Sequence, residues 1–236
     1  FIPHANAPEA AIIDGITVIP VKTLAELIAH LEGRATINPQ PKTEVPLSDE
    51  TPYVHIEDIR GQETAKRVLM IAASGGHNLL MVGPPGTGKT MLAQALASIL
   101  PAPTLEEIIE VTKIWSAGGA LGTQAMITYR PFRSPHQSAS PAAIVGGGQN
   151  PRPGEISLAH RGVLFLDELP EFRRDILESL RQPLESGRTV ISRAKSSLTL
   201  PARFALVAAM NPCPCGYYGD REKACACAAH EVMRYQ

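Results

Sequence analysis

The sequence predicts an α/β domain in which helices flank a parallel sheet. Three apolar runs of strand length are separated by segments with the periodicity of amphipathic helices. Strands that alternate with helices in this way are typical of a doubly wound α/β fold. A glycine-rich loop joins the first run to the helix after it, as in many folds of this class.

The first part of the chain predicts a strand over 15–21 and a helix that follows it. Thr23 is the candidate N-cap of this helix, with Glu26 three positions later. Residues 1–36 are too few to fold alone, and the chain does not begin with methionine, so we expect a piece of a longer protein. Residues 37–52 are polar and contain several prolines, which predicts a linker.

The remaining residues, 53–236, carry the elements of the predicted core. Continuous apolar character predicts three strands buried on both faces, over residues 78–82, 162–169 and 204–211. Helical periodicity is found over residues 61–75, 89–100, 104–119 and 173–187. Pro183 lies inside the last helix and is expected to bend it. Residues 188–192 and 197–200 predict a β-hairpin.

The glycine-rich loop "GPPGTGKT" predicts a phosphate-binding site. It matches G-x-x-x-x-G-K-[ST] and lies between a predicted strand and a predicted helix. Its glycines let backbone amides point toward phosphates, and the following helix adds a partial positive charge. Lys89 can reach the β- and γ-phosphates, and Thr90 can ligate Mg²⁺.

Polar residues at the ends of the other two strands complete this predicted site. Asp167 and Glu168 follow one apolar run, and Asn211 follows the next. Ligands of open α/β sheets lie beyond the carboxyl ends of the strands, so these side chains should face the phosphates. We expect Asp167 to hold Mg²⁺, Glu168 to act as general base and Asn211 to orient the attacking water.

Composition excludes several classes of protein. The 236 residues are 44% hydrophobic and 19% charged, as in a globular chain, with a formal net charge of −1. A site for a polyanion would therefore be a local patch. No apolar run reaches about 18 residues, so no transmembrane helix is expected. The N-terminal stretch lacks the features of a signal peptide, which favours a reducing cytoplasm.

All four cysteines lie in one short stretch after the third strand. They form two C-x-C pairs separated by nine residues, with glycines between them: Cys213, Cys215, Cys225 and Cys227. Four thiolates so placed can surround one tetrahedral Zn²⁺, which would stiffen a loop with little core. Free buried thiols or an adventitious disulfide are the alternatives.

In these residues the chain resembles the AAA+ ATPases, and more closely the ComM type of their magnesium-chelatase-like subfamily. The motifs that carry the resemblance include "VLFLDE", "RPFRSPHQSAS", "LRQPLESG" and "CAC". The resemblance makes residues 53–236 an AAA+ core with a cysteine insertion at 212–230. It makes residues 1–36 the end of a Lon-protease-like domain. It implies ATP contacts at Gly83, Pro84, Pro85, Gly86, Thr87, Gly88, Lys89, Thr90 and Met91, with Ile59 and Gly61 beside the adenine.

The same resemblance implies a ring-forming, hexameric ATPase. Members of the ComM type are DNA branch-migration motors, whereas chelatase motor subunits drive the insertion of Mg²⁺ into a tetrapyrrole. The cysteine cluster and the N-terminal segment favour the DNA motor. A nucleotide-switched scaffold without enzymatic activity is a third hypothesis. The Asp167–Glu168 pair argues against it, because a scaffold does not need a general base. In this family the arginine finger and the lid lie beyond the last residue here, so we expect ATP·Mg²⁺ binding with slow hydrolysis.

Several basic residues in insertions are candidate DNA contacts. Arg193 and Lys195 lie at the predicted hairpin tip, where they could grip phosphates in the pore of a ring. Arg130, Arg133 and Arg152 are weaker candidates. The alternative for each is a solvated surface charge.

Overall fold

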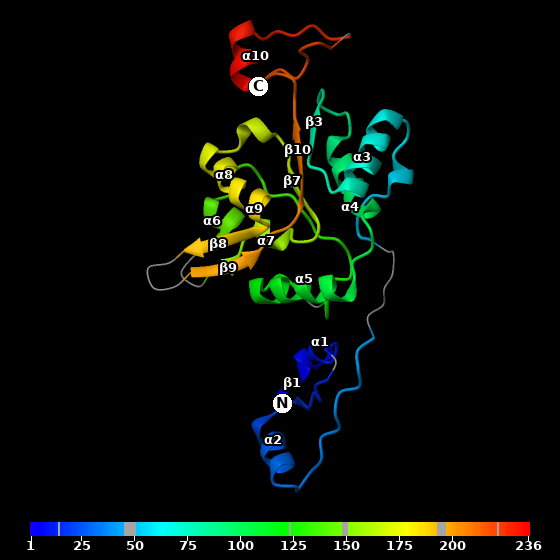
Figure 1. Cartoon of the computed structure of the whole chain (residues 1–236), viewed down its shortest axis with the longest axis vertical. Helices are drawn as coiled ribbons and strands as arrows, with labels where there is room; N and C mark the ends of the chain where they lie inside the picture. Colours follow the sequence, from blue (N-terminus) through cyan, green and yellow to red (C-terminus); the bar gives the residue numbers. More distant parts are fainter. Residues whose placement is uncertain (14, 45–50, 123, 148–150, 193–196, 221) are drawn as a thin grey trace.

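The computed structural model describes residues 1–236 except residues 14, 45–50, 123, 148–150, 193–196 and 221. Figure 1 shows an α/β core with a small N-terminal segment below it and helix α10 above it. No helix in the described part of the chain combines the length and the apolar character needed to span a bilayer.

A four-stranded parallel sheet forms the centre of the core. Its order is β3 (Leu79–Val82), β10 (Ala205–Met210), β7 (Val163–Leu166) and β4 (Phe132–Arg133). Every neighbouring pair is parallel. The predicted α/β fold with a parallel sheet flanked by helices is thus confirmed. Sequence periodicity did not indicate β4, which is only two residues long.

One face of the sheet is covered by α3 (Glu63–Gly75) and α4 (Lys89–Ile99), on the right in Figure 1. Leu69 of α3 and Leu96 of α4 are buried against Phe165 of β7 in one apolar cluster. Since the buried side chains of both helices recur on one side, this packing follows from their amphipathic pattern.

The opposite face is covered by short helices and their connections. Leu164 and Leu166 of β7 point into this second apolar cluster together with Ile176. The helices on this side are α6 (Pro141–Val145), α7 (Glu155–Leu158), α8 (Arg174–Ser179) and α9 (Arg181–Ser186). With both faces covered, all four residues of β7 are buried as predicted.

The prediction that the first strand is buried on both faces was wrong. Leu79 and Met81 of β3 pack against the α3–α4 cluster, but Leu80 and Val82 are 52% and 54% exposed. β3 is an edge strand of the described sheet, and the short helices on the second face do not extend across it. Apolar character alone does not distinguish a central strand from an edge strand.

Pro183 breaks the predicted helix rather than bending it. The chain forms α8 and α9, and the break falls between Ser179 and Arg181. A proline ring clashes with the carbonyl four residues earlier, which here belongs to Ser179, the last residue of α8. The break therefore lies where the steric rule places it.

The N-terminal segment has its own small apolar cluster of Ala7, Ala11 and Val18. Thr23 caps the predicted helix, and its hydroxyl accepts a 3.2 Å hydrogen bond from the Glu26 amide. The strand predicted over 15–21 is limited to two residues. The elements are β1 (Ile2–Pro3), η1 (His4–Asn6), α1 (Ala7–Ala10), β2 (Pro20–Val21) and α2 (Leu24–Leu31). A relation to Lon protease stays a prediction.

The other elements connect or extend the core. Helix α5 opens with the predicted capping box, in which Thr104 and Glu107 bond each other's backbone amides. The predicted hairpin is confirmed as an antiparallel pair. Their bounds are η2 (Ile56–Asp58), α5 (Leu105–Gly118), β5 (Gly146–Gly147), β6 (Arg152–Pro153), η3 (Leu169–Glu171), β8 (Arg188–Ser192), β9 (Ser197–Pro201) and α10 (Ala229–Tyr235).

Candidate functional site

The glycine-rich loop connects the end of β3 to the start of α4, at the carboxyl edge of the sheet. Gly86 and Gly88 have φ of +80° and +79°, a left-handed conformation that favours glycine. The loop is tied to the sheet because the Gly83 amide donates a 3.3 Å bond to the Met210 carbonyl at the end of β10. The sequence pattern therefore folds as a turn with backbone amides at a helix N-terminus.

Lys89 links this loop to the neighbouring strand. Its ammonium donates hydrogen bonds of 2.8 and 2.9 Å to the carbonyls of Gly83 and Pro84. A third bond, of 3.2 Å, joins it to the Asn211 side-chain oxygen, 122 positions later in the chain. Burial lowers the pKa of Lys89, and the Asp167 carboxylate partly offsets this. The structure thus brings together the lysine and the asparagine that sequence reasoning grouped.

Asp167 and Thr90 meet at the same edge. The Thr90 hydroxyl lies 3.2 Å from an Asp167 carboxylate oxygen, and the other oxygen accepts a 2.9 Å bond from the Glu168 amide. Glu168 is exposed and has φ of +52°, which is strained for a residue with a side chain. A hydroxyl and a carboxylate in contact are ligands that suit Mg²⁺.

A hollow of about 530 Å³ lies beside the loop. Lys89 and Thr87 line one side, and Val68 of α3 lines another. The hollow is lined by residues 62–65, 68, 69, 79–84, 87, 89 and 92. This lining does not include Ile59 or Gly61. Ile59 is buried in the α3–α4 cluster and Gly61 is exposed. Their adenine contacts stay predictions, as does a contact from the exposed Met91.

Gln62 is a site residue that sequence reasoning missed. Its side-chain amide donates a 2.6 Å hydrogen bond to the Thr87 carbonyl in the glycine-rich loop. The residue has φ of +57°, directly after Gly61 at +67°. The only signal in the sequence was a glycine just before a helix, which is common at helix starts and so is not specific.

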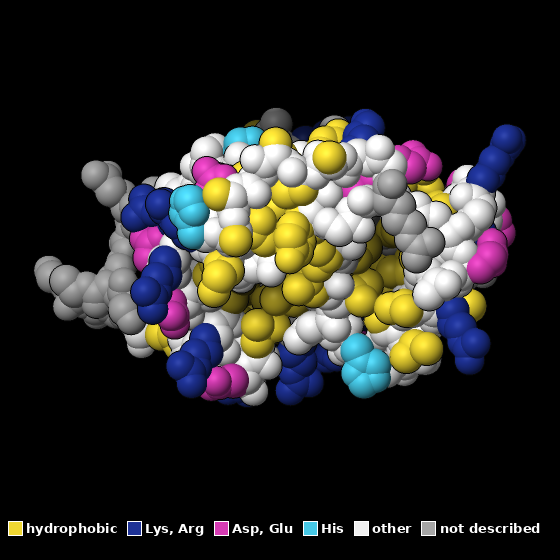
Figure 2. All heavy atoms as spheres, turned by 90° about the horizontal axis from the view of Figure 1, so that it is seen from above, with side chains coloured by type: hydrophobic (Ala, Val, Ile, Leu, Met, Phe, Trp, Pro, Cys, Tyr) yellow, Lys and Arg dark blue, Asp and Glu magenta, His cyan; other side chains and the backbone are white. Residues whose placement is uncertain are grey.

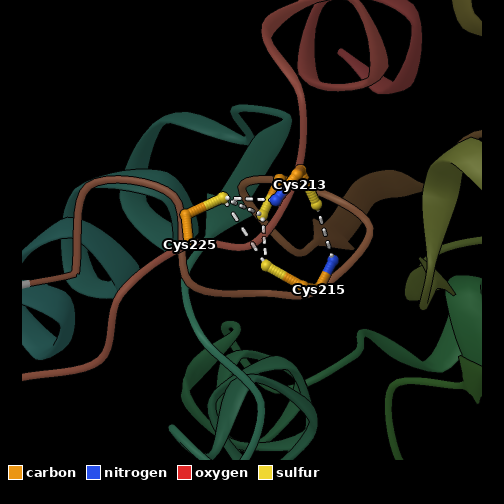
Figure 3. A group of neighbouring side chains, drawn as sticks. Cys213, Cys215 and Cys225 are labelled. Atoms are coloured by element: carbon orange, nitrogen blue, oxygen red, sulfur yellow. Dashed lines mark hydrogen bonds between the residues drawn. The ribbon is translucent and has the colours of Figure 1, made fainter.

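The four cysteines converge on one point. Their sulfur atoms all lie within 4.8 Å of one another, and Figure 3 shows three of the side chains pointing inward from two parts of the loop. The Cys213 sulfur is 3.4 Å from that of Cys215 and 3.7 Å from that of Cys225, and the last two are 3.6 Å apart. Zinc–sulfur bonds of about 2.3 Å in a tetrahedron separate sulfurs by about 3.8 Å, so the spacing fits one zinc ion.

Backbone amides support thiolates at this cluster. The Tyr218 amide lies 3.3 Å from the Cys213 sulfur, and the Cys215 amide 3.4 Å from that of Cys227. Amides of Tyr217 and Ala226 lower the pKa of Cys215 to about 6. For Cys227 the Cys215 amide lowers the pKa, but burial and the neighbouring sulfurs outweigh it and raise the pKa to about 12. The surroundings thus favour the thiolate at Cys215 and disfavour it at Cys227.

Two candidate DNA contacts, Arg130 and Arg133, form ion pairs within the chain. The Arg130 guanidinium lies 2.8 Å from Glu107, and its side chain is only 12% exposed. Arg133 makes bonds of 2.6 and 2.8 Å to both oxygens of Glu155 and lies over the Trp115 ring. These ion pairs differ from the solvated surface charge that was the alternative, and contacts of Arg130 and Arg133 with DNA stay predictions.

For the other basic candidates, DNA contact stays a prediction. Arg152 is exposed on β6. Arg193 and Lys195 lie outside the described residues, between the two strands of the β8–β9 hairpin. Among the histidines, His160 is buried, with its Nδ1 atom accepting a 3.0 Å bond from the Arg203 amide. His160 is thus a hydrogen-bonded part of the core.

A known protein family matches most of this chain. The family described as magnesium chelatase, subunit ChlI, matches residues 55–236. The chain belongs to this family. A solved complex of subunits BchI and BchD of magnesium chelatase contains a similar fold, with a TM-score of 0.55 and 26% identity. That match covers 78% of this chain and 60% of the other.

Curated relatives within this family extend over nearly the whole chain. YifB of Escherichia coli, described as uncharacterized, is 48% identical over 98% of this chain and 45% of its own length. Competence protein ComM of Haemophilus influenzae is 46% identical over 99% of the chain and 46% of its own length. The magnesium-chelatase 38 kDa subunit of Rhodobacter capsulatus is 29% identical over 68% and 51%. The chain therefore spans about half the length of the relatives that it matches.

Proposed function

We propose that this protein binds and hydrolyses ATP as the motor unit of a ring-forming, hexameric assembly. The observation that carries the proposal is the meeting of three strand ends: Lys89 bonds Asn211, and Thr90 contacts Asp167. A lysine, a hydroxyl, a carboxylate and an amide at one sheet edge suit phosphoryl transfer, in which catalysis consists of positioning and charge stabilisation. Membership of the ChlI family supports the same activity.

The residues divide the work by their chemistry. The amides of the glycine-rich loop and the Lys89 ammonium bind the phosphates. Thr90 and Asp167 would hold Mg²⁺, which neutralises charge on the phosphates when bound. Exposed Glu168 accepts the proton of the attacking water, and Asn211 orients that water. Because the Lys89 ammonium already bonds Gly83, Pro84 and Asn211, it would exchange one of these bonds for a bond to a bound phosphate.

The first test is nucleotide binding to the chain and turnover by protein of the relatives' length. Lys89→Ala should weaken ATP binding at least about tenfold, because it removes a charged donor to phosphate. Glu168→Gln should keep ATP binding and lower kcat by about 10² or more, because it removes the base. Equal turnover by wild-type protein and Glu168→Gln would contradict the assigned roles.

We propose further that this motor acts on DNA, as a branch-migration helicase in DNA uptake and recombination. The chain is 46% identical over 99% of its length to a competence protein, but 29% identical over 68% to a chelatase subunit. Branched DNA should then stimulate ATP hydrolysis by protein of the relatives' length, and the stimulation should vanish in Glu168→Gln.

A magnesium chelatase motor is the second candidate, favoured by the likeness to the BchI–BchD complex. It couples ATP hydrolysis to the insertion of Mg²⁺ into a tetrapyrrole, with a partner subunit. In that case DNA would leave turnover unchanged, and a co-purified partner together with a porphyrin would raise it. The two measurements on one preparation therefore separate the candidates.

We also propose that the four cysteines hold one structural Zn²⁺. The support is the sulfur spacing, 3.4 to 3.7 Å among Cys213, Cys215 and Cys225 and within 4.8 Å for all four, which suits a shared tetrahedral ion and is far longer than a disulfide bond of about 2.05 Å. A cytoplasmic location, also proposed, would keep these thiols reduced. Elemental analysis should find about one zinc per chain, and Cys225→Ser should lower it. Reduced wild-type protein without zinc would contradict the assignment.

A further inference from the structure

The cysteine loop, residues 213–227, packs directly on the glycine-rich loop. Gly216 is buried and has φ of +88°. A Cβ atom at Gly216 would lie 2.7 Å from Cδ and 2.9 Å from Cγ of Pro85. Contacts below about 3 Å are repulsive, so the backbone of one loop touches the proline ring of the other with no room for a methyl group. Pro85 of the phosphate site thus meets the cysteine loop.

The chain that follows the cysteine loop returns to the start of that loop. It starts after Asn211, whose side chain bonds Lys89. Helix α10 follows it and ends beside this start, where the Gln236 side-chain amide donates a 2.9 Å bond to the Pro212 carbonyl. Burial raises the pKa of Tyr235 in α10, and a hydrogen bond with the Asn211 backbone amide lowers it in part. The loop is therefore closed on the turn that carries Asn211.

The cysteine cluster is what gives this loop its shape. Among the described residues of 212–228, only Cys213 and Gly216 are buried. A loop with so little apolar core depends on its cross-links for a fixed conformation. Gly216 sits directly after Cys215, and its amide donates a 2.9 Å bond to the Cys213 carbonyl. The position of Gly216 is thus set by two of the four sulfur-bearing residues.

We propose that the metal-loaded cysteine loop positions the phosphate-binding loop through the contact of Gly216 with Pro85, so that metal binding and nucleotide binding strengthen each other. The proposal rests on the proposed nucleotide and zinc sites and adds the coupling between them. Gly216 and Pro85 act as positioning residues, since neither needs to touch the reacting atoms. By linkage, the factor by which zinc raises nucleotide affinity equals the factor by which nucleotide raises zinc affinity.

The first experiment compares two glycines of the same loop. Gly216→Ala should weaken the binding of ADP to the zinc-loaded chain by about tenfold, within the usual range of such couplings. Gly219→Ala is the matched control: its φ is +77°, so the backbone strain is alike, but a Cβ there meets nothing within 4 Å. Gly219→Ala should change ADP affinity less than about twofold. Equal losses in the two variants would overturn the proposal, since strain alone would then explain both.

A second variant tests whether the contact itself is responsible. Pro85→Ala removes the Cγ and Cδ atoms that the new methyl group would meet. In the Pro85→Ala background, Gly216→Ala should therefore cost much less ADP affinity than in wild type, a non-additivity expected of residues in contact. Additive effects would overturn the contact. Zinc content of about one per chain in all four proteins shows that the cluster stays intact.

The third experiment removes the metal. Zinc is stripped with a chelator that spares Mg²⁺, and ADP affinity is measured before, after and on return of Zn²⁺ alone. We expect about a tenfold loss and its recovery, with zinc affinity rising by the same factor when ADP is bound. Unchanged ADP affinity overturns the coupling but leaves the nucleotide site standing. If the zinc-loaded chain does not bind ADP at all, the proposed nucleotide site itself is overturned. In that case wild type and Lys89→Ala show the same absence of ADP binding.

Discussion

Gln62 holds the glycine-rich loop from outside the motif. Its amide group donates to the Thr87 carbonyl at 2.6 Å, and its backbone is left-handed at the N-cap of α3. The hydrogen bond fixes one side of the loop to α3, just as Gly83 fixes another side to β10. At the scale of single residues, the loop is therefore held by partners that its own motif does not contain.

Removing this donor should weaken nucleotide binding more than folding. We expect Gln62→Ala to raise the Kd for ADP about three- to tenfold, with a loss in free energy of unfolding of about 1 kcal/mol or less for one exposed hydrogen bond. Isothermal titration and thermal melts measure the two. Gln62→Glu, which keeps the length but replaces the donating NH₂ by an oxygen, is the control and should behave like Gln62→Ala. If Gln62→Glu binds ADP as wild type does, the bond to Thr87 is irrelevant.

His160 is a buried base whose pKa burial lowers. The Glu110 carboxylate, 3.3 Å from Nε2, works in the opposite direction but does not compensate, and Arg161 and Arg203 add to the lowering. Since Nδ1 accepts the Arg203 amide, the neutral ring carries its proton on Nε2 and donates to Glu110. Protonation would place a second donor against that amide.

Acid should therefore destabilise the fold through His160. The unfolded chain protonates this histidine near pH 6.5, above the pKa of the folded state, so the unfolded state binds more protons in the interval between them. The free energy of unfolding should be steady above about pH 7 and fall as pH drops below about 6.5. His160→Asn keeps an acceptor for the Arg203 amide and does not titrate, so its melting temperature should fall less over this range. A steeper fall in the variant would contradict the assignment.

At the scale of elements, period and length decide what could be predicted. The strands over β3, β7 and β10 and the helices α3, α4 and α5 were predicted because each has enough residues to show a pattern. The two residues of β4 are too few for an apolar run, and the five residues of α6 make little more than one helical turn. Both elements form in contact with neighbouring elements. The exposed side chains of β3 were missed because burial depends on the outer position of that strand, which is a property of the sheet.

The β8–β9 hairpin is the element in which DNA contacts can be tested. Its strands pair from Arg188 opposite Pro201 to Ser192 opposite Ser197, so Arg193 and Lys195 connect their ends. In protein of the relatives' length, Arg193→Ala/Lys195→Ala should reduce the slope of log K for DNA against log salt by about 1 to 2, since each duplex phosphate contact contributes about 0.9.

The control for the hairpin carries the same change of charge elsewhere. Arg174 and Arg181 lie on α8 and α9 with side chains 93% and 76% exposed. Arg174→Ala/Arg181→Ala should leave the salt slope nearly unchanged, because exposed charges outside the contact surface release no counterions on binding. Equal slopes for both double variants would argue against the hairpin as a DNA contact.

At the scale of the whole molecule, the parallel topology assembles the site. Thr90 and Asp167 are 77 positions apart in sequence, yet they meet because β3, which leads into the loop before Thr90, and β7, which Asp167 follows, end at one edge of the sheet. The sequence could predict this meeting from strand order in the fold class, since parallel strands present their carboxyl ends together. It could not predict that the cysteine loop packs on Pro85, because that contact depends on the path of a loop. Figure 2, viewed onto this end of the molecule, shows apolar side chains gathered in the middle and Lys and Arg toward the rim.

Stability of the whole chain should therefore report on two ligands at once. Nucleotide at about 100 times its Kd adds about 2.7 kcal/mol to the free energy of unfolding, which corresponds to about 5–10 °C in melting temperature for a domain of this size. Removing zinc should lower the melting temperature as well, since the cysteine loop has little apolar core of its own. Lys89→Ala should abolish the rise in melting temperature on adding nucleotide and keep the fall on removing zinc, because Lys89 belongs to the nucleotide site alone. Loss of both shifts in that variant would mean that Lys89 supports the fold itself, and its role in binding ATP would have to be abandoned.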